Sequence, residues 1–103
     1  MKPVIIVSTF PDKTSITKIA NQLVKKKLVA CVNIMKISSV YSWKGKIENQ
    51  PEYLGLFKTT KKNQSELKKE LRKLHPYDIP EIAEINVDSI NQPYLKWLVD
   101  STR

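Results

Sequence analysis

Apolar positions recur along the chain with two different periods, and the changes of period mark the predicted elements. A β-branched run at residues 4–9 predicts a short buried strand, which Phe10-Pro11-Asp12 ends. Residues 13–28 carry apolar side chains at three- and four-residue intervals, from Ile16 to Leu28, which predicts an amphipathic helix. The lysines at 25–27 suit its C-terminal end, where the helix dipole favours positive charge.

The middle of the chain predicts one long hairpin. Residues 30–43 and 47–60 are rich in strand-forming side chains and flank the turn Lys44-Gly45-Lys46. Both strands exceed the usual length of about five or six residues. Pro51 cannot donate to the ladder, so it indicates a bulge or a free edge. We expect the outer half of this arm to pair or pack with a neighbouring subunit, since an uncovered strand pair is prone to aggregate.

The last third of the chain predicts a helix, a strand and a second helix. Residues 65–74 form the first helix, which His75-Pro76 ends. Residues 82–88 alternate, with Ala83, Ile85 and Val87 on one face, and predict a half-buried strand. Residues 92–101 predict the final helix, with Pro93 in its first turn.

This order of elements predicts an α+β fold of the ferredoxin-like βαββαβ type. Its antiparallel four-stranded sheet is backed by two helices, with a long hairpin between the second and third strands and an added C-terminal helix. The 103 residues suffice for one domain, 1–103, because a second core could not be filled.

Composition narrows the partners and the compartment. Sixteen lysines and two arginines against ten acidic residues give a net charge of +8. Because arginine, the preferred reader of phosphates and guanine, is scarce, we expect a solvated lysine surface and no nucleic-acid partner. The lone Cys31 cannot form an internal disulfide, which favours a cytoplasmic location. The apolar run Val4 to Val7 is too short for a signal peptide or a membrane span, so we expect no membrane attachment.

Four segments carry a family resemblance. They are residues 28–34 (LVACVNI), 39–48 (SVYSWKGKIE), 57–60 (FKTT) and 75–81 (HPYDIPE), with Tyr94 and Trp97 near the end. In this order and spacing, over the whole chain, they resemble the CutA family of divalent cation tolerance proteins. The resemblance implies a ferredoxin-like fold, a homotrimer built by edge-to-edge strand pairing, and a role in tolerance of and response to copper and other divalent ions.

The same resemblance bears on the metal ligands. Copper binding in bacterial relatives is attributed to a cysteine in the first strand and to two adjacent histidines before Pro-Tyr. Here those positions hold Ser8 and Leu74-His75, so His75 is the remaining candidate and Cys31 a second one. One imidazole is no site by itself, and symmetry-related chains would have to supply more ligands. The alternatives are that His75 caps helix carbonyls and that Cys31 is a core residue.

The expected cofactor is accordingly copper or another divalent cation, with no organic cofactor. Aromatic and charged residues could in addition line a ligand cleft between subunits, or serve only as packing anchors of that interface. These residues are Tyr41, Trp43, Glu48, Lys58, Tyr77, Glu81 and Trp97.

The predicted function is a trimeric, metal-binding CutA-like protein that acts in divalent cation tolerance. The alternative is a trimeric small-molecule sensor similar to the PII signalling proteins, or an assembly protein, with its ligand cleft between subunits. An RNA-binding module has weaker support, since residues 53–57 match the aromatic motif of RNA recognition domains only loosely. We do not expect an enzyme, because the sequence has no Ser/His/Asp set and its two glycines cannot form a phosphate loop.

Overall fold

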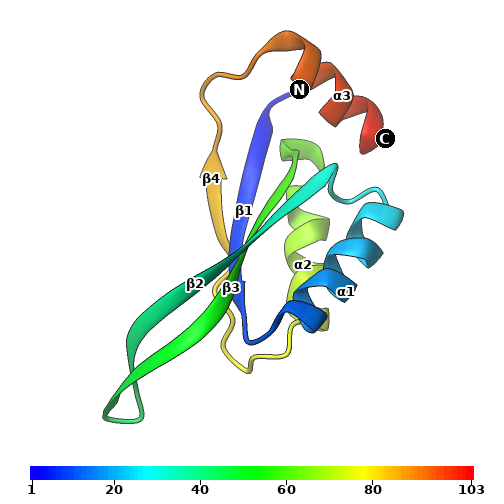
Figure 1. Cartoon of the computed structure of the whole chain (residues 1–103). Helices are drawn as coiled ribbons and strands as arrows, with labels where there is room; N and C mark the ends of the chain where they lie inside the picture. Colours follow the sequence, from blue (N-terminus) through cyan, green and yellow to red (C-terminus); the bar gives the residue numbers. More distant parts are fainter.

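The computed structural model describes all 103 residues and has the predicted order of elements (Figure 1). The four strands form one antiparallel sheet in the order β2-β3-β1-β4, which is the ferredoxin-like arrangement. The prediction of the α+β fold class is therefore confirmed. The elements are β1 (Pro3–Phe10), α1 (Lys13–Lys25), β2 (Cys31–Trp43), β3 (Lys46–Thr60), the 3₁₀ turn η1 (Lys61–Asn63), α2 (Gln64–Leu74), β4 (Ala83–Asn86) and α3 (Gln92–Ser101).

Helix α1 is shorter than the predicted range 13–28. Its last turn is closed by a Schellman motif, in which the amide of Leu28 donates to the carbonyl of Leu23 and that of Lys27 to Val24. Lys27 takes the left-handed conformation, with φ of 60°, that ends the helix. Leu28 keeps the expected apolar role from outside the helix, because it packs against the core.

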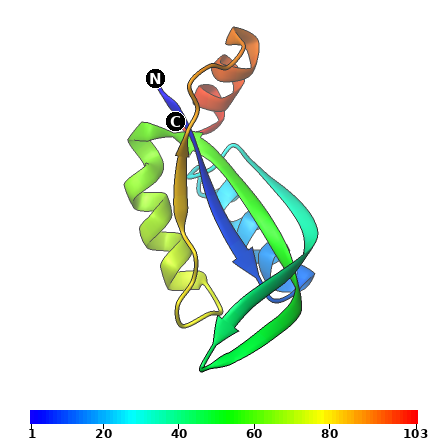
Figure 2. The same cartoon turned by 90° about the vertical axis from the view of Figure 1, so that its left-hand side faces the viewer.

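Helices α1 and α2 cover one face of the sheet (Figures 1 and 2). The core lies between these two layers and consists of Ile6, Phe10, Ile16, Ile19, Leu23, Val29, Phe57, Leu67 and Leu71. Gly55 lets the layers approach, since a Cβ on this residue would lie 2.6 Å from the Phe57 ring and 2.9 Å from Cδ1 of Ile16. Real Cβ atoms almost never come that close, so a larger residue here would force the core apart.

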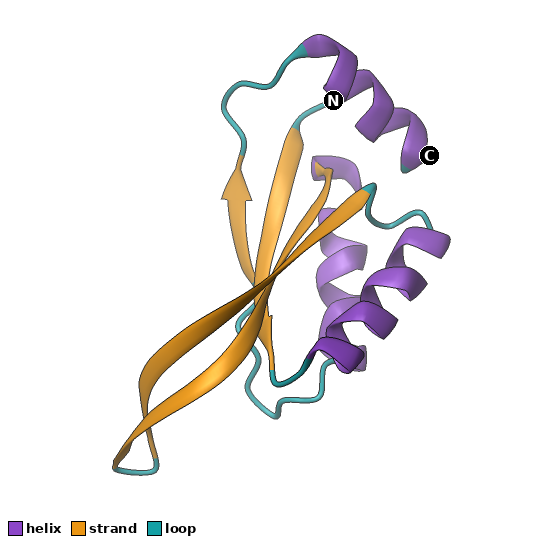
Figure 3. Ribbon diagram, in the orientation of Figure 1, coloured by secondary structure: helices purple, strands orange, loops and turns teal.

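The β2–β3 hairpin extends far beyond the rest of the sheet (Figure 3). Its register is continuous from the Cys31–Lys58 pair to the Trp43–Lys46 pair, so Pro51 causes no bulge. Only residues 53–60 of β3 pair with β1, so residues 46–52 have β2 as their one neighbour. Pro51 therefore lies on a free edge, the second of the two predicted arrangements. Positive φ angles at Lys44 and Gly45 close the arm with a tight two-residue turn.

The apolar face of β4 points away from the helices. Glu84 pairs with Ile6 on the helix side, where its carboxylate binds Lys61 at 2.7 Å and Lys68 at 2.8 Å. Ile85 lies on the opposite face and is 52% exposed. The predicted half-buried strand 82–88 is reduced to Ala83–Asn86, in which Ala83 and Glu84 are half-buried and Ile85 and Asn86 are exposed.

Helices α1 and α2 leave the face of the sheet that carries Ile85 uncovered (Figure 2), and only α3 reaches one end of it, where Tyr94 lies over Lys58. Strand alternation places further apolar side chains on this open face, among them Ile5, Leu54, Leu56, Ile37 and the 47% exposed Met35. A contiguous apolar surface of this kind marks an association or ligand-binding surface.

Candidate functional site

His75 lies at the C-terminal end of α2 and is only 8% exposed. Its ring stacks on Phe10, with 4.2 Å between the ring centroids. Nδ1 accepts the backbone N–H of Tyr77 at 3.1 Å, so in the neutral ring the proton belongs to Nε2. Nε2 then faces Oγ of Ser8, also at 3.1 Å. Both ring nitrogens thus have partners inside the chain.

Burial lowers the pKa of His75 below its ordinary value of 6.5, although the backbone of Thr9 and the charge of Glu52 act in the opposite direction. The imidazole is therefore neutral at physiological pH. The hydrogen bond from the Tyr77 amide requires a neutral ring. Protonation would place a hydrogen on Nδ1, which could then no longer accept the Tyr77 N–H.

Tyr77 connects the segment after His75 to the hairpin. Its hydroxyl donates to Oε2 of Glu52, at 2.7 Å, and Glu52 is only 8% exposed on β3. Burial, together with this hydrogen bond, raises the pKa of Tyr77 far above its ordinary value. The phenol therefore stays protonated and serves as a donor to the buried carboxylate.

A groove of about 840 Å³ runs between the segment 76–81 and the arm of the hairpin. Four of the seven residues predicted for a ligand cleft line it, namely Tyr41, Trp43, Tyr77 and Glu81. Two further carboxylates, Asp78 and Glu52, reach the same groove, along with apolar side chains of β1, β2 and β3. Aromatic walls with a few acidic groups suit a small organic ligand or a segment of another chain.

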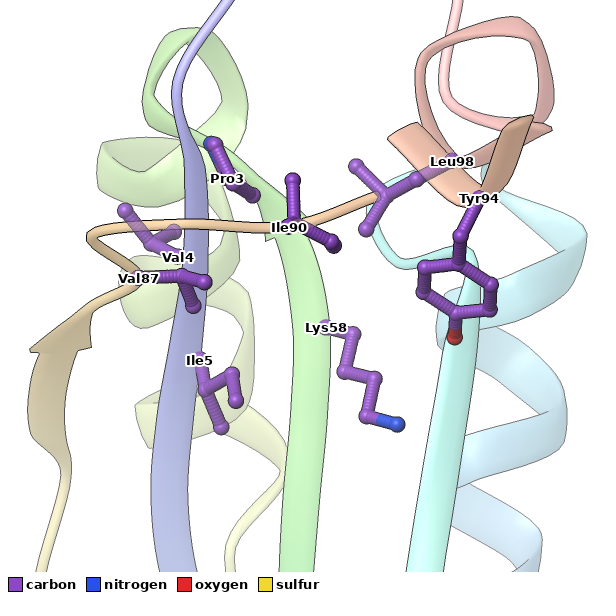
Figure 4. A pocket seen from close by; sticks show the side chains of 8 residues that line it. All are labelled: Pro3, Val4, Ile5, Lys58, Val87, Ile90, Tyr94 and Leu98. Atoms are coloured by element: carbon purple, nitrogen blue, oxygen red, sulfur yellow. The ribbon is translucent and has the colours of Figure 1, made fainter. Parts of the chain in front are cut away.

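The other three predicted residues lie elsewhere. Nζ of Lys58 is 5.6 Å from the centre of the Tyr94 ring, in a smaller apolar pocket of about 210 Å³ under α3 (Figure 4). Trp97 packs against Tyr94 from within α3, with 5.4 Å between ring centroids. Glu48 lies half-buried on the arm, where it accepts a hydrogen bond from Gln50.

The two candidate metal ligands are not brought together. Cys31 is half-buried opposite Lys58, near one end of the sheet, whereas His75 contacts Ser8 and Phe10 near the other. Within one chain no three His, Cys, Asp or Glu side chains converge as metal ligands would. Because both nitrogens of His75 are also engaged, the residues of a single chain do not fit a preformed copper or zinc site.

Sequence reasoning missed Glu52 and Asp78 as lining residues of the groove. Glu52 occurs in a strand whose neighbours alternate between the two faces, and nothing local marks it as buried. Its hydrogen-bond partner, the Tyr77 hydroxyl, lies 25 positions away in the sequence.

Comparison with known proteins decides the family. A family model described as "CutA1 divalent ion tolerance protein" matches residues 4–101. The chain belongs to the CutA1 family. It is 42% identical to the "Divalent-cation tolerance protein CutA" of Pyrococcus horikoshii over 100 residues, which are 97% of this chain and 98% of that protein.

Solved CutA1 structures share the fold. The crystal structure of CutA1 from Pyrococcus horikoshii matches with a TM-score of 0.95 at 41% identity, covering 97% of this chain and 98% of the other. A structure described as "periplasmic divalent cation tolerance protein CutA" from Archaeoglobus fulgidus matches with a TM-score of 0.94 at 33% identity, covering 98% and 99%. These relatives confirm the ferredoxin-like fold of the chain. None of its helices is long and apolar enough to cross a membrane.

The neutral, buried His75 predicts a pH-dependent stability. Because its folded-state pKa is lowered, the unfolded chain binds more protons in the window below about 6.5. The free energy of unfolding should be fully maintained above pH 6.5 and should fall as the pH drops toward the folded-state pKa, by at most about 1.4 kcal/mol per pH unit for this one group. Urea denaturation between pH 5 and 8, at fixed protein concentration, measures this slope.

Two variants isolate the histidine. His75→Gln should flatten the slope between pH 5.5 and 6.5, since the chain has no other histidine. Tyr77→Phe removes the bond to Glu52 but not the titrating ring, so it should lower stability while keeping the slope. An unchanged slope in His75→Gln would contradict the assignment.

Proposed function

We propose that this CutA1 protein works as a homotrimer in the tolerance of divalent metal ions, copper among them. The proposed role in metal tolerance is supported by membership of the CutA1 family. The proposed association is supported by the apolar open face of the sheet. The arm adds exposed apolar side chains that one chain leaves uncovered, including Val40, Trp43 and Ile47. Three copies can cover this surface and can bring side chains of different subunits together.

The proposed metal site is shared between subunits, because one chain provides no cluster of three ligands. His75 contributes a nitrogen only if the ion displaces one of its present partners, and Glu52, whose charge acts on the His75 ring, is the carboxylate that we expect to join it. Neutral imidazole suits copper and zinc. We place the protein in the cytoplasm on the strength of its single free cysteine.

The association state is the first test. Sedimentation equilibrium should give a mass about three times the 11.9 kDa of the chain. Replacing Met35 and Ile85 with Asp puts two charges on the open face and should dissociate the protein, because buried unpaired carboxylates cost several kcal/mol each.

Val24→Asp is the matched control for this test. Val24 is 44% exposed, much like Met35 and Ile85, but it lies on α1 on the opposite side of the molecule. The control should leave the mass unchanged. A monomeric wild-type protein, or equal dissociation by the control, would contradict association through the open face.

Metal binding is tested by calorimetry of the assembled protein with CuCl₂ and with ZnCl₂. We expect saturable copper binding in the micromolar range, weakened at least about tenfold by His75→Ala or His75→Gln, since a lost ligand costs 1.4 kcal/mol or more. Cys31→Ser should bind as the wild type does. Absence of saturable binding would contradict the metal site, and binding indifferent to both His75 variants would exclude His75 from it.

The groove favours a second candidate function, a PII-like sensor of small molecules. Its volume of about 840 Å³ and its aromatic walls are those of a ligand pocket, and an adjoining subunit could close it. A metabolite or nucleotide that binds there should raise the melting temperature, because a ligand at 100 times its Kd adds about 2.7 kcal/mol of stability. Trp43→Ala should abolish the shift. If no compound in a broad screen changes the melting temperature, the sensor function is rejected.

A further inference from the structure

The net positive charge of the chain is confined to one layer of the fold. Residues 13–28 and 61–74, which contain α1, η1 and α2, carry eleven lysine and arginine residues and only two glutamates. The remaining 73 residues carry seven basic and eight acidic side chains. The solvated lysines expected from composition are thus concentrated in the helix layer, which has a net charge of +9 (eleven minus two), whereas the rest of the chain has −1 (seven minus eight).

Most cations of the helix layer have no acidic partner. Only Lys26, Lys61 and Lys68 form ion pairs, the first with Glu70 and the other two with Glu84. Eight others are exposed and have no carboxylate within ion-pair distance, namely Lys13, Lys18, Lys25, Lys27, Lys62, Lys69, Arg72 and Lys73. Their mutual repulsion would be relieved by a polyanion that spans several of them.

The geometry of the layer suits an extended ligand. Helices α1 and α2 lie side by side and run in opposite directions, so the lysines at 25–27 and at 61–62 gather at the same end (Figures 1 and 2). The Lys26–Glu70 pair fixes the two helices to each other. At about 1.5 Å per residue, α1 is roughly 20 Å long, enough to follow several successive phosphates of a nucleic-acid strand.

We propose that the helix layer binds the phosphate backbone of duplex nucleic acid without reading its sequence. Lysine binds phosphate as a point charge, and the layer has only one arginine, Arg72, to offer bidentate readout of guanine. It contains no Phe, Tyr or Trp, the side chains on which unpaired bases stack.

A membrane surface fits the same layer less well. The apolar stripes of α1 and α2 are buried in the core, which leaves Val24 as the layer's one exposed large hydrophobic side chain. An interfacial helix needs a free apolar face to enter the headgroup region. Duplex backbone, which requires charge alone, is the better match.

The test is fluorescence anisotropy of a labelled, mixed-sequence 24-base-pair DNA titrated with the intact protein between about 25 and 200 mM KCl. We expect a Kd on the order of micromolar at the lowest salt concentrations. The logarithm of the binding constant should fall against the logarithm of the salt concentration with a slope of about −4.5, since each of roughly five neutralised phosphates contributes about 0.9. No binding at 25 mM KCl, or a slope near zero, would overturn the proposal.

Two triple variants of equal charge locate the surface. Lys18, Lys25 and Lys69 replaced by Glu, or Lys2, Lys44 and Lys46 replaced by Glu, each lower the net charge from +8 to +2. The helix-layer variant should lose at least about thirtyfold in affinity, and the control less than about threefold. Replacing the same three helix-layer residues by Gln gives a milder variant if the Glu form does not fold. Equal losses in both sets would assign the binding to overall charge and overturn the proposal.

Two competitors identify the partner. Vesicles containing phosphatidylserine, or a single-stranded oligonucleotide of the same length, should displace the duplex less well than unlabelled duplex at equal phosphate concentration. Stronger displacement by the vesicles would assign the layer to a membrane surface. Stronger displacement by the single-stranded oligonucleotide would show that the helix layer prefers single strands. Either result would overturn the proposal.

Discussion

The structure depends on one asymmetry: helices α1 and α2 cover one face of the sheet, whereas only α3 reaches one end of the other face. Ile6, Phe10 and Phe57 bury their side chains against α1 and α2, while Ile85 and Met35 on the other face are 52% and 47% exposed. A domain of this size buries a modest share of its surface on folding. Covering the exposed apolar face by association would therefore add much to the apolar area that the chain buries. The long arm is also incompletely covered, because residues 46–52 of β3 have only β2 beside them.

The candidate site follows from this asymmetry. His75 ends α2 on the covered side, and the segment that follows it turns around the edge of the sheet to reach the arm on the open side. The hydrogen bonds from Tyr77, one to the His75 ring and one to Glu52, fix that segment in place. The groove thus lies between the core, which α1 and α2 cover, and the exposed apolar surface of the arm. The two faces then differ in chemistry, since the helix layer carries the positive charge and the open face is apolar.

Local pattern was sufficient to predict most of the fold. Every predicted helix and strand exists, because the periodicity of apolar residues reports burial directly. It failed where the relevant contact is distant in sequence. The apolar alternation around Ile85 was correct, but no local signal reveals that its apolar face points away from α1 and α2, or that Glu84 forms ion pairs with Lys61 and Lys68. Tyr41, Trp43, Tyr77 and Glu81 share a groove within one chain, whereas Glu48, Lys58 and Trp97 lie elsewhere in it.

The central claim is that other copies of the chain cover the open face and the arm. Hydrogen–deuterium exchange of the amides in residues 36–43 and 46–52 tests it directly, because in a single chain the N–H groups on the free edges of the arm have no acceptor. The account predicts that nearly all of these amides exchange at least about a hundredfold more slowly than those of an unstructured peptide, in step with the core strands. Exchange of alternate arm amides at unstructured rates, at concentrations where the core is fully protected, would contradict it.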